Sequence, residues 1–419
     1  MKIKIRKNAV TIMTFFIILM ENVFYLIDTE AIHIAGAFAY SDIWLVLLIF
    51  YFGYHLLKYR KLKTKYYFGI QVAILVILVF ISALQQNSLT GQSLWLGIRP
   101  QRNYLLILLT YFPMRKMFAT MKIKVDELMN ALLTVGTFSA GFFLLQKFTI
   151  DYVQFLNVIM GERNGVRFYI DSTLIQITAI IAIYKFSKEY KLKYLINLLI
   201  CIAYEVWVSQ GRLEIIAVSL TVLIGFLLTK KMSGKKLLGI CCVIFAVFVF
   251  MNSSYADELW KAIATMNTAT ATQGNTMEIR YIGRVRYIEQ LGESLKTFLL
   301  GCGYPNALYS PAAKKAGYDL GIGLNDNGIF GFTYIYGFIG LIVIVILMIK
   351  FLRLSYRLYK MNGNTVCLTY MILNICLGYN IIFWYWKSDG TFIMILMLCV
   401  VEHLTREGMK TFEGEKDNG

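Results

Sequence analysis

Arginines gather late in the chain, at positions 280, 284 and 286, and the carboxylate of Asp326 follows further on. Arginine presents a planar fork of donors that suits phosphate and carboxylate groups, and it keeps its charge at physiological pH. Arg280 and Arg284 are four residues apart, so a helix places them on one face. In the functional interpretation, the carboxylate of Asp326 faces the same substrate. These residues predict a site that binds an anion with several oxygens.

Other arginines stand beside turn residues between apolar runs. Two flank Pro100, two flank the turn Asn164-Gly165, and one follows Gly211 in a link too short to hold it far from hydrocarbon. We predict catalytic roles for Arg280, Arg284 and Asp326, and ligand-binding roles for Arg99, Arg102, Arg163, Arg167, Arg212, Arg286 and Asn327.

Several of these residues have a structural alternative. The arginines beside Pro100 could anchor a membrane helix by extending to its surface. Arg167 could pair with Asp171 at helical spacing. Asp326 or Asn327 could cap the helix that follows by accepting its first backbone N–H groups. The sequence leaves these alternatives open.

The composition excludes an ordinary soluble domain. Of 419 residues, 58% are hydrophobic and 16% are charged, whereas soluble domains are about 45–50% apolar. Apolar runs of about 17–25 residues, the length that a helix needs to cross hydrocarbon, recur along the chain. We therefore predict an all-α polytopic membrane protein. About twelve transmembrane helices are predicted, at 9–28, 42–58, 66–84, 103–121, 128–147, 168–186, 193–210, 213–229, 236–252, 329–349, 365–386 and 390–405.

The net charge of +17 could indicate a nucleic-acid partner, but the placement of the charge argues otherwise. With a cytoplasmic N-terminus, most lysines and arginines fall in short inner connections, which is the positive-inside pattern. Both termini are then cytoplasmic, the protein lies in the cell membrane, and no nucleic acid is bound. The predicted parts are helices 1–9 (1–252), a large extracytoplasmic loop between helices 9 and 10 (253–328), helices 10–12 (329–405) and a cytoplasmic tail (406–419).

The middle of the large loop carries apolar residues at helical spacing. These residues are Tyr281, Val285, Ile288, Leu291 and Leu295. A period near 3.6 predicts an amphipathic helix, which would carry the arginines at 280 and 284.

The sequence shows no motif for binding a metal or a cofactor. The seven cysteines and three histidines do not show metal-ligand spacing. We interpret the cysteines as small apolar residues of the spans, and we predict a metal-independent protein without a cofactor.

The order of these motifs resembles the Wzy-type polysaccharide polymerases, relatives of the O-antigen ligases. The resemblance covers most of the chain as a layout of many spans with one large outer loop late in the sequence. It is sharpest over Gly283-Arg284, the amphipathic helix, the turn 299–303 (Leu-Leu-Gly-Cys-Gly) and Asp326-Asn327. The segment 209–212 looks like the family's Ser-Arg segment, although Gln-Gly intervenes, and 165–167 is similar to its other outer arginine. The large loop lacks the histidine of the ligase branch, which favours a polymerase.

The resemblance implies a glycosyltransferase that joins undecaprenyl-pyrophosphate-linked oligosaccharide repeat units on the outer face of a bacterial cytoplasmic membrane. The arginines at 280, 284 and 212 would then hold pyrophosphate, and Arg167 would hold pyrophosphate or acidic sugars. Asp326 would act as base or position the acceptor. Expected partners are the lipid-linked oligosaccharide, the bilayer, and a flippase and a chain-length regulator of the same pathway. The alternatives are a flippase or other transporter, a ligase-type glycan transferase, and a non-catalytic membrane scaffold.

Overall fold

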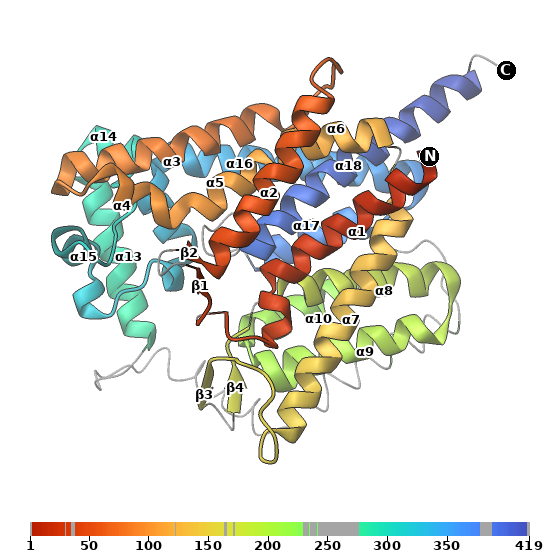
Figure 1. Ribbon diagram of the computed structural model, residues 1–419, viewed down its shortest axis with the longest axis horizontal. Coiled ribbons are helices and arrows are strands. Elements are labelled where there is room, and N and C mark those ends of the chain that lie inside the picture. The colour runs from red at the N-terminus through yellow and green to blue at the C-terminus, as the bar shows by residue number, and fades with distance from the viewer. Residues whose placement is uncertain are drawn as a thin grey trace.

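The computed structural model describes residues 2–29, 31–34, 38–121, 123–162, 166–170, 172–228, 234, 241, 276–377 and 388–416. Helices make up most of this described chain (Figure 1). The first half contains α1 (Lys2–Met20), α2 (Tyr40–Lys58), α3 (Gly69–Thr90), α4 (Leu94–Ile98), α5 (Arg102–Leu109), α6 (Tyr111–Met121), α7 (Val125–Thr149), α8 (Thr173–Glu189), α9 (Leu192–Tyr204) and α10 (Arg212–Leu228). The second half contains α13 (Thr276–Gly292), α14 (Leu295–Leu300), α15 (Ser310–Ala316), α16 (Gly328–Asn362), α17 (Val366–Cys376) and α18 (Ser388–Lys416).

Shorter elements connect the helices. Single helical turns are η1 (Asn22–Tyr25), η2 (Arg99–Gln101), η3 (Glu205–Ser209, of π type), η5 (Tyr318–Leu320) and η6 (Asn325–Asn327). Two antiparallel hairpins pair β1 (His33–Ile34) with β2 (Phe38–Ala39), and β3 (Met160–Glu162) with β4 (Val166–Phe168).

Six helical segments of the described chain are long and apolar enough to cross a membrane. They are α2, α3, α7, the continuous segment Leu192–Ser209 made by α9 and η3, the segment Asn325–Asn362 made by η6 and α16, and Ser388–Gly408 of α18. Three shorter apolar helices cover Ala9–Met20, Leu213–Leu228 and Val366–Cys376. The class of α-helical membrane protein is therefore confirmed. The count of twelve spans stays a prediction, because 236–252 lies largely outside the described residues.

Some predicted spans differ from the helices found. The span expected at 103–121 is two helices, α5 and α6, which meet at Thr110. Pro113 explains the break, because it has no N–H to donate to the carbonyl of Leu109 four residues earlier. The first span was expected to reach residue 28, but α1 ends at Met20. There the chain turns through positive φ angles, from 51° to 58°, over Asn22–Tyr25.

The connections between helices gather at two opposite ends of the bundle. At one end Lys116 donates to the carbonyl of Tyr59, and Arg406 donates to that of Lys65. Figure 1 shows both chain termini at this end. The other end carries the hairpins, α13 and α15. Which end faces the cytoplasm stays a prediction.

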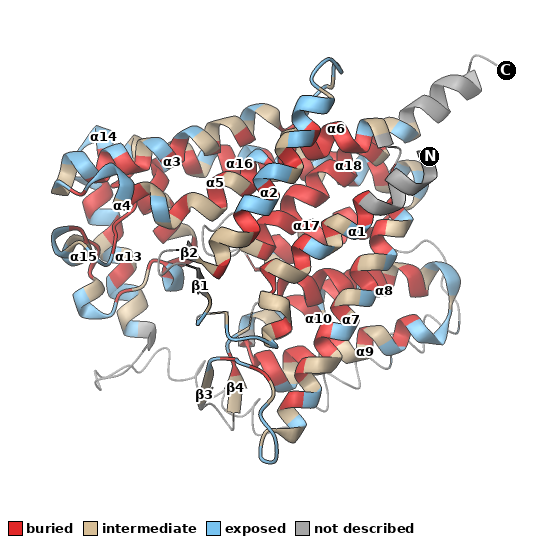
Figure 2. Cartoon of the chain, viewed as in Figure 1, coloured by how far each residue is buried: buried red, intermediate tan, exposed pale blue. Residues whose placement is uncertain are grey.

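Helix α18 forms the centre of the bundle. All ten residues from Phe392 to Val401 are buried, and Figure 2 shows buried residues along this helix. It packs against α16, α6, α5 and α8. A helix that is apolar all round is expected in such a position, because other helices rather than lipid surround it.

A buried ion cluster fastens one end of α18. The carboxylate of Glu402 lies 3.1 Å from Arg115 and 2.8 Å from Arg406, and the side chains of Arg115 and Glu402 are each 2% exposed. The same carboxylate accepts hydrogen bonds from the hydroxyl of Tyr111 and the backbone N–H of Tyr67. One acid thus joins α18, α6 and the start of α3.

Candidate functional site

The turn that follows α14 is inserted into a break in α16. Gly337 has φ 69° and ψ −173°, which interrupts the helix, and Gly301 faces it with φ 81°. A Cβ on Gly337 would lie 2.3 Å from the carbonyl oxygen of Leu299, so the close approach requires glycine. The backbone N–H of Cys302 donates to the carbonyl of Tyr334 at 2.7 Å. The predicted turn 299–303 is therefore a docking element.

Hydrogen bonds attach the chain after this turn to the segment that ends α3 and begins α4. Gln92 is fully buried, and its amide donates to the carbonyl of Tyr304 and accepts from the backbone N–H of Asn306, at 2.9 and 2.8 Å. The Asn306 side chain donates to the carbonyl of Leu96. These contacts cross more than two hundred positions of sequence. They join this part of the predicted loop to the bundle.

The α13 helix is the predicted amphipathic helix, and it packs against η6 and the start of α16. Gly283 allows this contact. A Cβ at that position would lie 2.7 Å from the Asn327 amide and 2.7 Å from the Ile322 side chain. Asn327 is fully buried, and its amide donates to the carbonyl of Gly323 at 2.8 Å. The close packing sets the position of the arginines on either side of Gly283.

Arg280 and Asp326 come together although they are 46 positions apart. The Arg280 guanidinium lies 3.4 Å from Asp326 Oδ1, with the two side chains 38% and 56% exposed. An exposed ion pair of this kind contributes only about 0–1 kcal/mol. An anionic ligand could therefore replace the carboxylate at little energetic cost.

Arg284 lies one turn further along α13. Its guanidinium carbon is 5.8 Å from the ring centre of Phe330, in the first turn of α16. This cation–π contact holds the planar group beside the start of that helix. The N-terminus of a long helix carries partial positive charge, which adds to that of the two arginines. The arrangement is suited to a multiply charged anion. Sequence analysis missed Phe330, because an aromatic residue in an apolar helix carries no signal of its own.

The amide of Asn327 does not cap α16. Asn327 is the N-cap residue, yet its side chain forms no cap hydrogen bond and turns back to Gly323. Its complete burial places it beneath the surface, where it supports η6. In this geometry Asn327 contacts Gly323, and its ligand-binding role stays a prediction.

Arg286 points away from the pair on α13. Its guanidinium donates to the carbonyls of Lys315 and Lys314 at 3.0 and 2.8 Å. These carbonyls lie in the last turn of α15, where the positive charge of arginine complements the helix dipole. Gln290 donates to the same Lys315 carbonyl. The contacts give Arg286 a structural function between α13 and α15.

Arg102 is bound within the protein. Its Nε lies 2.7 Å from Asp42 Oδ1, and its other nitrogens donate to the Ser41 hydroxyl and the Arg99 carbonyl. Asp42 also accepts from the Ala39 N–H at the start of α2. The ion pair joins the starts of α2 and α5. Arg99 itself is exposed at the end of α4.

Arg167 belongs to another part of the same end. Arg167 lies on β4, paired with Gly161, and its guanidinium carbon is 5.0 Å from the Tyr169 ring centre. Figure 1 shows this hairpin apart from α13. Arg163 lies outside the described residues, as does the side chain of Arg212, although α10 begins at Arg212. The described residues therefore unite Arg280, Arg284 and Asp326, and leave Arg167 separate from them.

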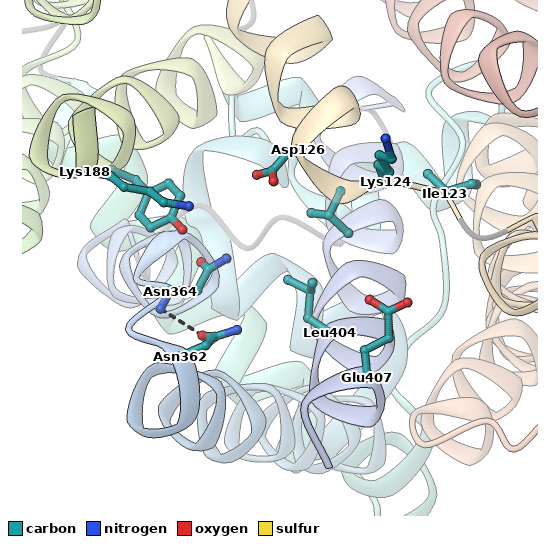
Figure 3. A pocket seen from close by; sticks show the side chains of 10 residues that line it. Ile123, Lys124, Asp126, Lys188, Asn362, Asn364, Leu404 and Glu407 are labelled. Atoms are coloured by element: carbon teal, nitrogen blue, oxygen red, sulfur yellow. Dashed lines mark hydrogen bonds between the residues drawn. The ribbon is translucent and has the colours of Figure 1, made fainter. Parts of the chain in front are cut away.

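A polar pocket opens at the opposite end of the bundle, which carries the termini. It has a volume of about 350 Å³, and Figure 3 shows Lys124, Asp126, Lys188, Asn364 and Glu407 around it. The lining comes from the start of α7, the end of α8, the α16–α17 turn and α18. Its charged side chains are two lysines, an aspartate and a glutamate, so it does not share the excess of arginines found at the other end.

Among the residues that the structure describes, no three histidine, cysteine or acidic side chains are grouped so as to hold a metal ion. The chain matches no protein-family model, and no curated protein is significantly similar to it. The chemistry of the arginine site therefore has to be argued from its own residues.

Proposed function

We propose that this protein is a polysaccharide polymerase that transfers an oligosaccharide from a lipid pyrophosphate to a second lipid-linked unit. The observation that carries the proposal is the convergence of Arg280, Arg284 and Asp326 at the start of the long membrane helix α16. A lipid-linked diphosphate has its charge beside hydrocarbon, and a site at the start of an apolar helix long enough to cross a membrane suits such a ligand.

The guanidinium groups suit the departure of pyrophosphate. Breaking the anomeric C–O bond places negative charge on the leaving oxygen, and fixed donors aimed at that oxygen stabilise it. Arg284 is held by Phe330, while Arg280 can exchange its weak contact with Asp326 for phosphate oxygens. The Asp326 carboxylate, which lies beside Arg280, would accept the proton of the attacking hydroxyl.

A transporter of lipid-linked sugars is the second candidate, and a broken helix favours it. Transporters place interrupted helices around their substrate, and α16 is interrupted at Gly337. In this protein, however, the turn at Gly301 fills the break and the backbone N–H of Cys302 bonds to Tyr334 across it. The break therefore serves as a joint between α14 and α16.

The experiment that tests the proposal uses the purified protein in liposomes with lipid-linked repeat units. The wild type is expected to form high-mass glycan, and Arg284→Ala is expected to form none. Arg284→Lys is also expected to fail, because an ammonium group cannot replace the planar fork. Arg357→Ala, an exposed arginine near the other end of α16, is the matched control and is expected to keep activity.

Full polymer from Arg284→Ala would refute the assignment of this residue. Translocation of the lipid-linked unit without polymer formation by the wild type would refute the polymerase and support the transporter.

A further inference from the structure

Three of the apolar residues that predicted α13 are exposed, whereas a fourth, Leu291, is buried. Tyr281, Val285 and Ile288 follow one another at spacings of four and three residues, and they are 67%, 37% and 55% exposed. The face that meets the bundle instead contains Gly283 and Tyr287, which are buried. A helix on a soluble surface would turn its apolar row inward. The row of α13 therefore faces a medium other than the bundle.

Specific contacts fix this orientation. The Tyr287 ring lies 4.6 Å from that of Tyr334, centre to centre. The Tyr334 hydroxyl in turn donates to the Gln290 side chain at 3.1 Å. Both contacts come from the buried face of α13, where Gly283 also permits close approach. The outward row cannot turn inward without breaking them.

The exposed row adjoins the apolar outer surface of a membrane helix. The next helix, α14, stacks Phe298 on Phe338 of α16, with ring centres 5.1 Å apart. From Phe338 an exposed apolar surface continues along α16 through Ile342, Val345, Ile346 and Ile349. Since α16 is long and apolar enough to cross a membrane, that surface contacts lipid. Through α14, which contacts both helices, this apolar surface of α16 lies close to α13.

Charges flank the row as expected for a helix at a membrane surface. Arg280 and Arg284 border one side, and Glu278 and Glu289 border the other. Helices that lie in the interface bury an apolar face among acyl chains and keep charged groups at the level of the headgroups.

We propose that α13 lies in the membrane–water interface, with Tyr281, Val285 and Ile288 in contact with the acyl chains of the bilayer. The proposal does not depend on glycosyl transfer. If the proposed function also holds, this placement sets Arg280 and Arg284 at headgroup depth, where the diphosphate of a lipid carrier lies.

The test measures collisions of a nitroxide spin label with oxygen, which concentrates in lipid, and with a water-soluble nickel chelate. Labels are attached to single cysteines in a cysteine-free chain reconstituted in phosphatidylglycerol–phosphatidylethanolamine vesicles. Ile288→Cys is the test position, Val345→Cys on α16 is the lipid reference, and Asp319→Cys, exposed on η5, is the water reference. The ratio of oxygen to nickel collisions at 288 is expected to exceed that at 319 and approach that at 345.

A ratio at 288 equal to that at 319 would overturn the proposal and place the helix in water. A label at 288 that neither reagent reaches would also overturn it, in favour of a protein partner. A benzophenone amino acid at position 288 of the chain with its native cysteines gives an independent measurement, with photocrosslinks to lipid as the expected product. Absence of lipid adducts at 288, with adducts at 345, would contradict the proposal.

Discussion

Gly283→Ala offers the sharpest test of how the arginine site is positioned. The added methyl group would lie 2.7 Å from the Asn327 amide and 2.7 Å from Ile322, both shorter than any ordinary carbon contact. Neither neighbour can move easily, since Asn327 is buried and bonded to Gly323, and Ile322 is 1% exposed. The backbone of α13 must therefore shift away from η6.

The expected cost follows from overpacking. Forcing an extra methyl group into a filled contact destabilises it by about 1–3 kcal/mol, which is about 5- to 150-fold in the equilibrium between docked and undocked α13. Amide hydrogen exchange at 325–330 should accelerate by a factor in this range, because exchange follows local opening. Polymer formation should fall together with it, because the shift of α13 moves both Arg280 and Arg284 away from the start of α16.

Gly292→Ala is the matched control. Gly292 ends the same helix, and a Cβ there meets no atom within 4 Å. Alanine favours the helix over glycine by up to about 1 kcal/mol, so this variant should keep activity and slow exchange. Equal exchange rates and equal activity in Gly283→Ala and Gly292→Ala would refute the close packing of α13 on η6.

Three further outcomes concern stability and reactivity. Arg102→Ala should lower the thermal unfolding temperature in detergent, because the ion pair of Arg102 with Asp42 joins α2 to α5. Polymerisation should remain measurable. Complete loss of activity at normal stability would contradict this prediction. Burial raises the pKa of the Cys302 thiol to about 12, so the thiol stays protonated at pH 7–9. Maleimide should therefore label Cys302 only after denaturation. Rapid labelling of the folded protein would show that the turn is open. Glu402→Leu should lower the free energy of unfolding by about 3–5 kcal/mol, because it leaves the buried guanidinium of Arg115 uncompensated. Adding Arg115→Leu should restore part of this stability. If the double variant shows no recovery, Glu402 stabilises the protein without this arginine.

The helices and the class of the protein were predictable from the sequence. Long apolar runs can satisfy their backbone groups in a membrane only as helices, so the prediction at 128–147 closely matches α7, and the prediction at 66–84 overlaps most of α3. The spacing of the apolar residues after 280 likewise predicted α13. These features depend on local composition and periodicity, which the sequence shows directly.

Contacts and orientation were decided only by the tertiary structure. The pairing of Arg280 with Asp326, the packing of Phe330 under Arg284 and the binding of Arg102 to Asp42 join residues far apart in sequence. The apolar row of α13 showed its period in the sequence but not the side on which it faces, because periodicity is the same whether protein or lipid covers it. Glycine contacts such as Gly283 against Asn327 determine that choice, since they fix which face can approach the bundle.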